Sequence, residues 1–180
     1  MTGWEWPLSF AARDFRPYGR GPSVRSVGGV IKFRFLEDDM VDGNVVEAVT
    51  VEEAWTLLAS RELGRVATSA SGEPDIYPVN YFADAGRILF RTAAGTKLSE
   101  IAVNPRLAFE ADSADDHGGW SVIAKGDARI LVTTRDIAAA DGLPLRSWVP
   151  TLKYDYVEIA VDEISARRFV FGPEPERYPM

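Results

Sequence analysis

The 180-residue sequence contains no cysteine and only one histidine, His117. Without cysteine the chain has no disulfide, no thiolate nucleophile and no cysteine-ligated zinc or iron–sulfur site. His117 lies in a run of aspartates and glycines at residues 115–119, which predicts a polar, solvated turn and no metal site. A Ser-His-Asp triad would need this histidine. We therefore expect any redox chemistry to be carried by a bound cofactor.

Long apolar runs and targeting signals are also missing. No apolar run approaches the roughly 20 residues needed to cross a bilayer. The N-terminus lacks the basic segment, apolar stretch and small-residue cleavage site of a secretory signal. We expect a cytoplasmic protein with no membrane partner, and the length favours a single domain.

Charge is unevenly distributed along the chain. Residues 1–36 carry six basic and two acidic side chains, and the overall charge of −7 leaves −11 on the rest. Such an acidic body repels a phosphate backbone, so nucleic acid is not an expected partner. Because glycine and proline punctuate the basic segment, we predict a basic, partly disordered extension over residues 1–44 and a folded domain over 45–180.

Three short helices are expected. Thr50, with Glu53 three residues later, forms a capping box for a helix whose apolar stripe runs to Leu63, with Gly64 ending it. A second helix opens at residues 95–97 and stops before Pro105, and a third follows Thr134.

The remaining periodic segments favour strands. We expect strands over residues 65–69, 76–82, 88–92, 107–111, 120–131, 154–161 and 164–171. Six or more short strands with turn residues between them predict a mainly β protein with short helices, built as a small antiparallel barrel. The long strand over 120–131 is expected to bend at Gly126.

The Gly95-Thr96-Lys97 sequence at the start of the second helix has the parts of a phosphate site. It offers backbone N–H donors, a hydroxyl and an ammonium, and Arg91 lies one strand end earlier. The spacing is not that of a P-loop, and a solvated lysine with a surface arginine is the alternative interpretation.

Seven motifs in order resemble the pyridoxamine 5'-phosphate oxidase-related family of flavin-binding split barrels. They occupy residues 63–68 (LGRVAT), 72–74 (GEP), 77–81 (YPVNY), 86–93 (GRILFRTA), 95–98 (GTKL), 104–110 (NPRLAFE) and 120–130 (WSVIAKGDARI). Residues 148–150 and 164–169 fit more weakly. The resemblance implies a six-stranded antiparallel split β-barrel of the FMN-binding type.

The resemblance also implies a homodimer that holds FMN in a groove between subunits. The implied phosphate ligands are Arg91, Thr92, Thr96 and Lys97. The implied neighbours of the flavin ring are Pro78, Val79, Asn80, Tyr81, Ser121 and Val122. Trp148 is either a substrate-facing wall, contributed across the dimer, or a packing residue, and for Trp120 core packing is favoured.

By this resemblance the chain is expected to be an FMN-dependent oxidoreductase. A reduced donor would deliver hydride to the flavin and a small organic acceptor would take it, with no side chain as an acid–base catalyst. Many relatives have histidine where this chain has Arg91, and no histidine follows His117, so vitamin B6 oxidation is not expected. The alternative is a non-catalytic carrier of flavin, of the deazaflavin F420 or of haem, the last disfavoured by the single histidine.

Overall fold

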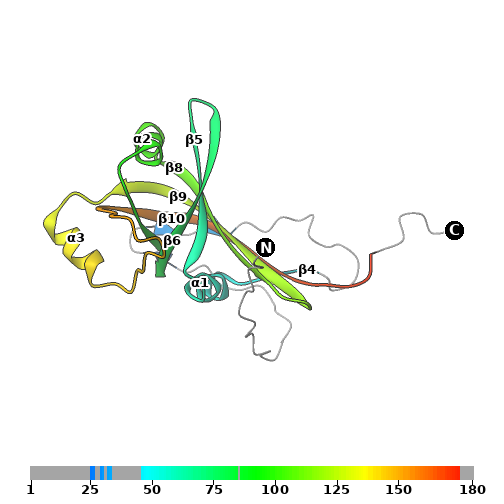
Figure 1. Ribbon diagram of the computed structural model, residues 1–180. Helices are drawn as coiled ribbons and strands as arrows, with labels where there is room; N and C mark the ends of the chain where they lie inside the picture. Colours follow the sequence, from blue (N-terminus) through cyan, green and yellow to red (C-terminus); the bar gives the residue numbers. More distant parts are fainter. Residues whose placement is uncertain (1–24, 27–28, 31, 34–45, 85, 175–180) are drawn as a thin grey trace, which may run out of the picture.

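The computed structural model describes residues 25–26, 29–30, 32–33, 46–84 and 86–174 (Figure 1). The predicted partial disorder of residues 1–44 therefore falls largely outside the described residues. Within that segment, β1 (Arg25–Ser26) pairs with β2 (Gly29–Val30), and β3 (Lys32–Phe33) pairs in parallel with the last strand, β10 (Asp155–Val170).

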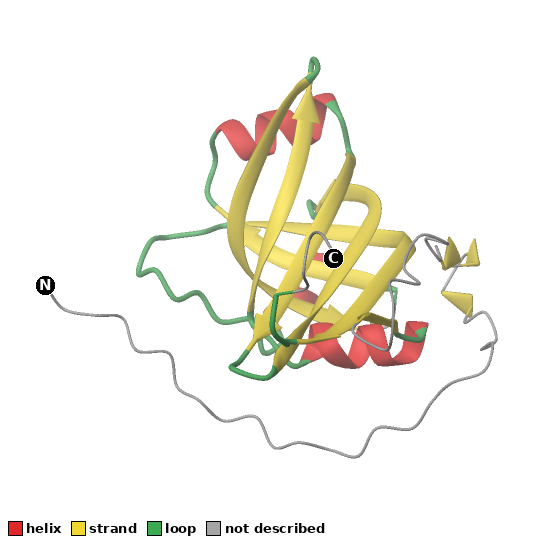
Figure 2. Ribbon diagram, turned by 90° about the vertical axis from the view of Figure 1, so that its right-hand side faces the viewer, coloured by secondary structure: helices red, strands yellow, loops and turns green. Residues whose placement is uncertain are grey.

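Six antiparallel strands form a closed ring. They are β5 (Leu63–Ala70), β6 (Glu73–Asp84), β7 (Arg87–Thr92), β8 (Arg106–Ala114), β9 (Gly118–Ile130) and β10. The order around the ring is β10-β7-β6-β5-β8-β9, and pairing of β9 with β10 closes it (Figure 2). The short β4 (Val46–Ala48) adds to β10. The predicted mainly β fold with a six-stranded antiparallel split barrel is confirmed.

The two expected closing strands are one long strand. β10 runs without a break from Asp155 to Val170, where the sequence predicted an interruption between residues 161 and 164. The register against β9 shifts between Val161 and Glu163, so Asp162 is a bulge and not a turn. This single strand pairs with β7 at its start and with β9 along most of its length, which joins both sides of the ring.

The first helix begins where its cap predicts. The Thr50 hydroxyl accepts a hydrogen bond from the Glu53 backbone N–H at 3.2 Å and opens α1 (Val51–Ala59). The prediction that Gly64 ends this helix was wrong, because Ser60 is the C-cap and Gly64 already lies in β5. A Cβ at Gly64 would lie 2.3 Å from Phe109 Cζ, so the glycine serves close packing between β5 and β8.

The other two helices are α2 (Thr96–Val103) and α3 (Thr134–Asp141). Thr133, one residue before the predicted cap, accepts from the Asp136 N–H and starts α3. α1 and α2 lie at opposite ends of the ring, and α2 stands beside the β5–β6 hairpin (Figures 1 and 2). Among the described helices, none is long and apolar enough to cross a membrane.

The ring encloses one main core. Its largest fully buried side chains include Trp120, Phe90, Phe109, Leu58, Ile88 and Ile159. A smaller cluster of Leu89, Leu131, Ala140 and Tyr156 lies beneath α3. Trp120, only 2% exposed, is therefore a core residue, as its packing interpretation predicted.

Candidate functional site

The N-terminus of α2 is open. Gly95, its N-cap, has a φ of 157° and makes no side-chain capping bond. Among the described atoms nothing lies within 4 Å of where a Gly95 Cβ would be, and no side chain caps the first backbone N–H groups of α2. Exposed N–H donors at a helix start favour an anion. Thr96 is exposed at this point, as the predicted phosphate site requires.

Lys97 lies in the first turn of α2, half-buried against aromatic rings. Its Nζ is 5.0 Å from the ring centroid of Tyr77 and 5.9 Å from that of Phe90. Burial and, secondarily, the nearby ammonium of Lys153 lower the pKa of Lys97. No carboxylate of the described chain lies within 4.0 Å of its Nζ, so its donors remain free for an anionic ligand.

A polar cluster fixes the Tyr77 ring beneath Lys97. The Tyr77 hydroxyl is 3.0 Å from both carboxylate oxygens of Glu100, and the Thr68 hydroxyl donates to Glu100 at 2.7 Å. Burial and the bond to Glu100 raise the pKa of Tyr77 to about 12. The bond from Thr68 is the main cause of the lowered pKa of Glu100. Glu100 is thereby engaged with hydroxyl groups while the aromatic face meets the ammonium.

The hydrogen bond between Thr68 and Glu100 makes the free energy of unfolding depend on pH. We expect Thr68→Val to lower the free energy of unfolding at pH 7, because the ionised, half-exposed Glu100 loses the hydrogen bond from the buried Thr68 hydroxyl. The pKa of Glu100 is lowered by folding from its ordinary 4.5, so this stabilisation is present above that value and disappears as pH falls through the folded pKa. Urea denaturation at pH 7, 5 and 3.5 measures the difference from wild type.

The control for this prediction is Thr56→Val. The Thr56 hydroxyl bonds an exposed helix carbonyl, that of Glu52, and no carboxylate, so any difference from wild type should not vary with pH. A Thr68→Val penalty of equal size at all three pH values would contradict the assigned role of Glu100.

Arg91 connects β7 to the loop of residues 142–154. Its Nε and Nη2 donate to the Lys153 carbonyl at 3.2 and 2.8 Å, and its guanidinium lies 5.1 Å from the ring centroid of Tyr156. Two of its donors are therefore used within the chain, and Nη1 remains for a ligand. Its neighbour Thr92 is buried, with its hydroxyl donating to the Ala93 carbonyl.

Asn80 and Trp148 hold the same loop at a second point. The Trp148 backbone N–H donates to Asn80 Oδ1 at 3.0 Å, and its indole Nε1 donates to Glu62 Oε2 at 3.1 Å. Asn80 Nδ2 donates to the Glu62 carbonyl, so both ends of this buried amide have partners within the chain. Trp148 remains 54% exposed, which leaves one face of the indole open.

Between these two attachments lies a shallow hollow, whose empty space of about 160 Å³ is open to solvent. It is lined by Asn80, Arg91, Leu145, Arg146, Ser147 and Lys153. The sequence interpretation missed Arg146 and Lys153, because it treated residues 142–150 as a plain loop. The only signal in the sequence was the two basic residues themselves. The strand that follows them, β10, begins opposite Thr92.

The predicted ring-binding strand turns most of its side chains inward. Val79, Tyr81 and Val122 belong to the main core, and the Tyr81 hydroxyl donates to the buried Leu58 carbonyl at 2.6 Å. Pro78 is exposed. β6 pairs with β7 only through residues 81–84, so the backbone of residues 74–80 has no strand partner on that side within the described chain. Any contact of a ligand with Val79, Tyr81 or Val122 must be made through the backbone.

Pro78 and Ser121 lie in two neighbouring rows on the outer face of the sheet. Strand register places Arg65 opposite both Pro78 and Glu110, and Asp112 opposite Ser121. Arg65 joins the two rows by ion pairs to Glu110 and Asp112 at 2.8 and 2.7 Å. The described contacts do not join these rows to the Lys97 region. Within one chain the contacts connect Arg91, Asn80 and Trp148 through the loop of residues 142–154, and Lys97 lies within electrostatic range of Lys153 in that loop.

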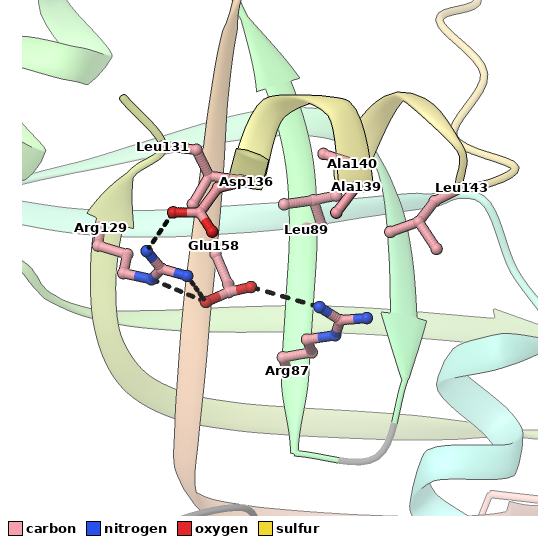
Figure 3. Close-up of a pocket in the computed structure, with 9 residues that line it drawn as sticks. All are labelled: Arg87, Leu89, Arg129, Leu131, Asp136, Ala139, Ala140, Leu143 and Glu158. Carbon is pink, nitrogen blue, oxygen red and sulfur yellow. Dashed lines mark hydrogen bonds and ion pairs between the residues drawn. The ribbon is translucent and has the colours of Figure 1, made fainter. Parts of the chain in front are cut away.

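A larger hollow of about 310 Å³ lies beneath α3 (Figure 3). Its charged side chains neutralise one another: Glu158 pairs with Arg129 and Arg87, and Arg129 also reaches Asp136. The rest of the lining is apolar, and no unpaired charge points into it. His117 is exposed and lies in a turn in which the backbone N–H groups of His117 and Gly118 donate to Asp115 Oδ1. Neither place has the free donors of the Lys97 region.

A closed ring of six antiparallel strands with short helices at its ends is the architecture of the split β-barrels. A sequence profile of the family described as pyridoxamine 5'-phosphate oxidase matches residues 50–168, and the chain belongs to this family.

Individual relatives agree with this assignment. A solved structure of a Corynebacterium glutamicum protein, a candidate pyridoxamine 5'-phosphate oxidase, is 44% identical, with a TM-score of 0.67, and the match covers 73% of this chain and 98% of that one. An FAD-binding protein of Mycobacterium smegmatis is 38% identical, with a TM-score of 0.62, over 70% of this chain and 100% of its own. An uncharacterised Mycobacterium tuberculosis protein is 43% identical over 50% of this chain and 82% of its own.

Proposed function

We propose that the chain binds a flavin nucleotide, with FMN as the first candidate, and places its phosphate at the start of α2. The observation that carries this proposal is the Lys97 ammonium, half-buried on two aromatic faces beside free helix N–H groups and without a carboxylate partner in the described chain. A phosphate gains charge-assisted bonds there, with Thr96, Arg91 Nη1 and the Thr92 backbone as further donors. The flavin binding of the M. smegmatis relative supports this choice.

The ring of the flavin would lie along the unpaired edge of β6. The backbone of residues 74–80 offers hydrogen-bonding groups to the polar edge of a flat heterocycle, and the exposed indole of Trp148 offers an apolar surface beside it. No described contact joins the outer-face rows of Pro78 and Ser121 to Lys97 in one chain, so we propose that a second copy supplies them in a homodimer. The complete site then needs both subunits.

When bound, a flavin supplies hydride transfer between a reduced donor and a small organic acceptor. The chain's contribution is to hold the phosphate through Lys97, to orient the ring through the backbone of β6 and to exclude water with the 142–154 loop. No side chain is assigned as an acid–base catalyst.

Purification and cofactor titration test the proposal. We expect the protein to bind FMN or FAD in a 1:1 ratio per chain and to acquire a flavin absorbance spectrum. Separate titrations with FMN, FAD, F420 and haem, followed by absorbance and fluorescence, identify the cofactor. Binding of haem alone, or of none of the four, would overturn the flavin proposal. Preference for F420 would support the proposed phosphate site but identify the bound ring as a deazaflavin.

A non-catalytic flavin carrier is the second candidate function. The hollow beside Arg91 is shallow and has no enclosed space for a substrate in one chain. Anaerobic addition of NADH, NADPH or reduced F420 to the loaded protein distinguishes the two functions. Bleaching of the flavin spectrum followed by reoxidation with an organic acceptor supports the oxidoreductase, and no reduction by any donor supports the carrier.

A further inference from the structure

Three cations line one hollow, and a fourth, in the first turn of α2, lies within electrostatic range of one of them. The three are Arg91, Arg146 and Lys153, and the fourth is Lys97, whose pKa the ammonium of Lys153 lowers. Elsewhere in the described chain most basic side chains have carboxylate partners: Arg65, Arg87, Arg106, Lys125, Arg129 and Arg168 all form ion pairs. These four cations have none within 4.0 Å among the residues that the structure describes. In a chain with a net charge of −7, this is a concentrated exception.

The cations are close enough to repel one another. Arg91, Arg146 and Lys153 line the same small hollow. The ammonium of Lys153 disfavours the charged form of Lys97, which places the fourth cation within electrostatic range of that hollow. Like charges gathered without counter-charges raise the free energy of the folded chain, and a bound anion offsets this cost.

The loop that presents Arg146 and Lys153 is anchored at two points, Trp148, two residues after Arg146, and Lys153 itself. Arg91 binds the Lys153 carbonyl with two donors, and Asn80 and Glu62 bind the backbone and indole of Trp148. The anchors use the carbonyl of Lys153 and leave its ammonium free. The carboxylate of Glu62 accepts the indole N–H of Trp148 and forms no ion pair with a cation of the group. The two basic side chains are thus held at the hollow by bonds that do not neutralise them.

A single phosphomonoester needs fewer donors than this group provides. Lys97, Thr96 and the free N–H groups of α2 already suffice for one phosphate. We propose that Arg146 and Lys153 form a second anion-binding position, adjoining that of Lys97 and Arg91, which takes a second phosphate group. This rests on the proposed flavin site and deepens it. The second phosphate belongs either to the flavin itself, as in a pyrophosphate-bridged dinucleotide, or to a separate nucleotide that binds beside FMN.

The test compares FMN and FAD in the double variant Arg146→Gln/Lys153→Gln. We expect the Kd for FAD to rise at least about 10-fold, while the Kd for FMN changes less than about 3-fold, because only the dinucleotide has a phosphate to lose. A matched double variant, Arg135→Gln/Lys125→Gln, removes the same two charges away from the hollow. It should leave both Kd values near wild type and so controls for the overall field.

The remaining outcomes separate the source of the second phosphate from failure of the inference. If neither flavin is affected but the FMN-loaded double variant loses affinity for inorganic pyrophosphate, the second phosphate belongs to a separate ligand and the inference stands. If FMN and FAD weaken equally, the four cations serve one phosphate and the inference falls. It also falls if no Kd changes.

Inorganic pyrophosphate also distinguishes this inference from the proposed function. If the wild-type chain binds no flavin, the same titration is made on the ligand-free protein by calorimetry. Weaker pyrophosphate binding in Arg146→Gln/Lys153→Gln than in the matched control supports the second anion position without a flavin. Equal binding in the two variants overturns it.

Discussion

Lys97→Ala is expected to weaken FMN binding about 10- to 100-fold, the loss that follows from removing one or two charge-assisted hydrogen bonds to a phosphate. The ammonium lies on the faces of Tyr77 and Phe90 and has no carboxylate partner in the described chain, so its removal breaks no ion pair of the fold. Burial lowers the pKa of Lys97, which shows that the charged form is held at some cost without a ligand. Fluorescence titration of FMN at neutral pH measures the effect.

Two further variants make the Lys97 result specific. Lys125→Ala removes a lysine that pairs with Glu163 at 2.9 Å on the barrel surface, and it should change FMN affinity less than about 2-fold because exposed ion pairs contribute little. Lys97→Arg should recover part of the affinity through its retained charge. If Lys97→Ala binds FMN as tightly as the wild type, the phosphate lies elsewhere and the proposed site is misplaced.

Local sequence signals were sufficient for the starts of elements. Thr50 and Glu53 form a capping box whose hydrogen bond depends on residues three apart, and Gly95 is the N-cap of α2 although it offers no side chain for capping. The strand alternation likewise depends only on neighbours, so the six strands and the mainly β class were predictable.

Tertiary contacts decided what the sequence left open. Glycine is common at the end of a helix. Gly64 nevertheless lies in β5, where Phe109 of β8 packs against its Cα. Residues 161–164 resemble a turn, but pairing with β9 on both sides of Asp162 keeps β10 continuous. Both outcomes depend on strands far away in the chain, which local propensity does not describe.

The candidate site also has a part that the local sequence predicts and a part that depends on distant contacts. Lys97 was predictable because it follows Gly95 at a helix start, a local arrangement. Arg146 and Lys153 were not, because their position depends on the Arg91 guanidinium binding a carbonyl 62 residues away and on Asn80 binding the backbone of Trp148, 68 residues away. Val79 and Tyr81 were assigned to the ring site from the strand they occupy, whereas their side chains pack in the core.

Gly126→Val is expected to destabilise the fold by about 3 kcal/mol or more, the range for a side chain forced into filled space. A Cβ at this position would lie 2.1 Å from the Ala160 carbonyl oxygen and 2.8 Å from its carbon. Gly126 pairs with Leu107 on one side and Val161 on the other, next to the bulge at Asp162, so neither neighbouring strand can move away without breaking the ring. Urea denaturation gives the free energy of unfolding.

Gly172→Ala is the matched control, because no described atom lies within 4 Å of its would-be Cβ, and its effect should stay within about 0.5 kcal/mol. An intermediate loss for Gly126→Ala, smaller than that for valine, would tie the penalty to side-chain volume at the closest approach of β9 and β10. A Gly126→Val protein as stable as the wild type would mean that β10 can shift away from β9 at the bulge. Closure of the ring would then tolerate a side chain where the strands are in closest contact, and the predicted bend at Gly126 would not depend on glycine.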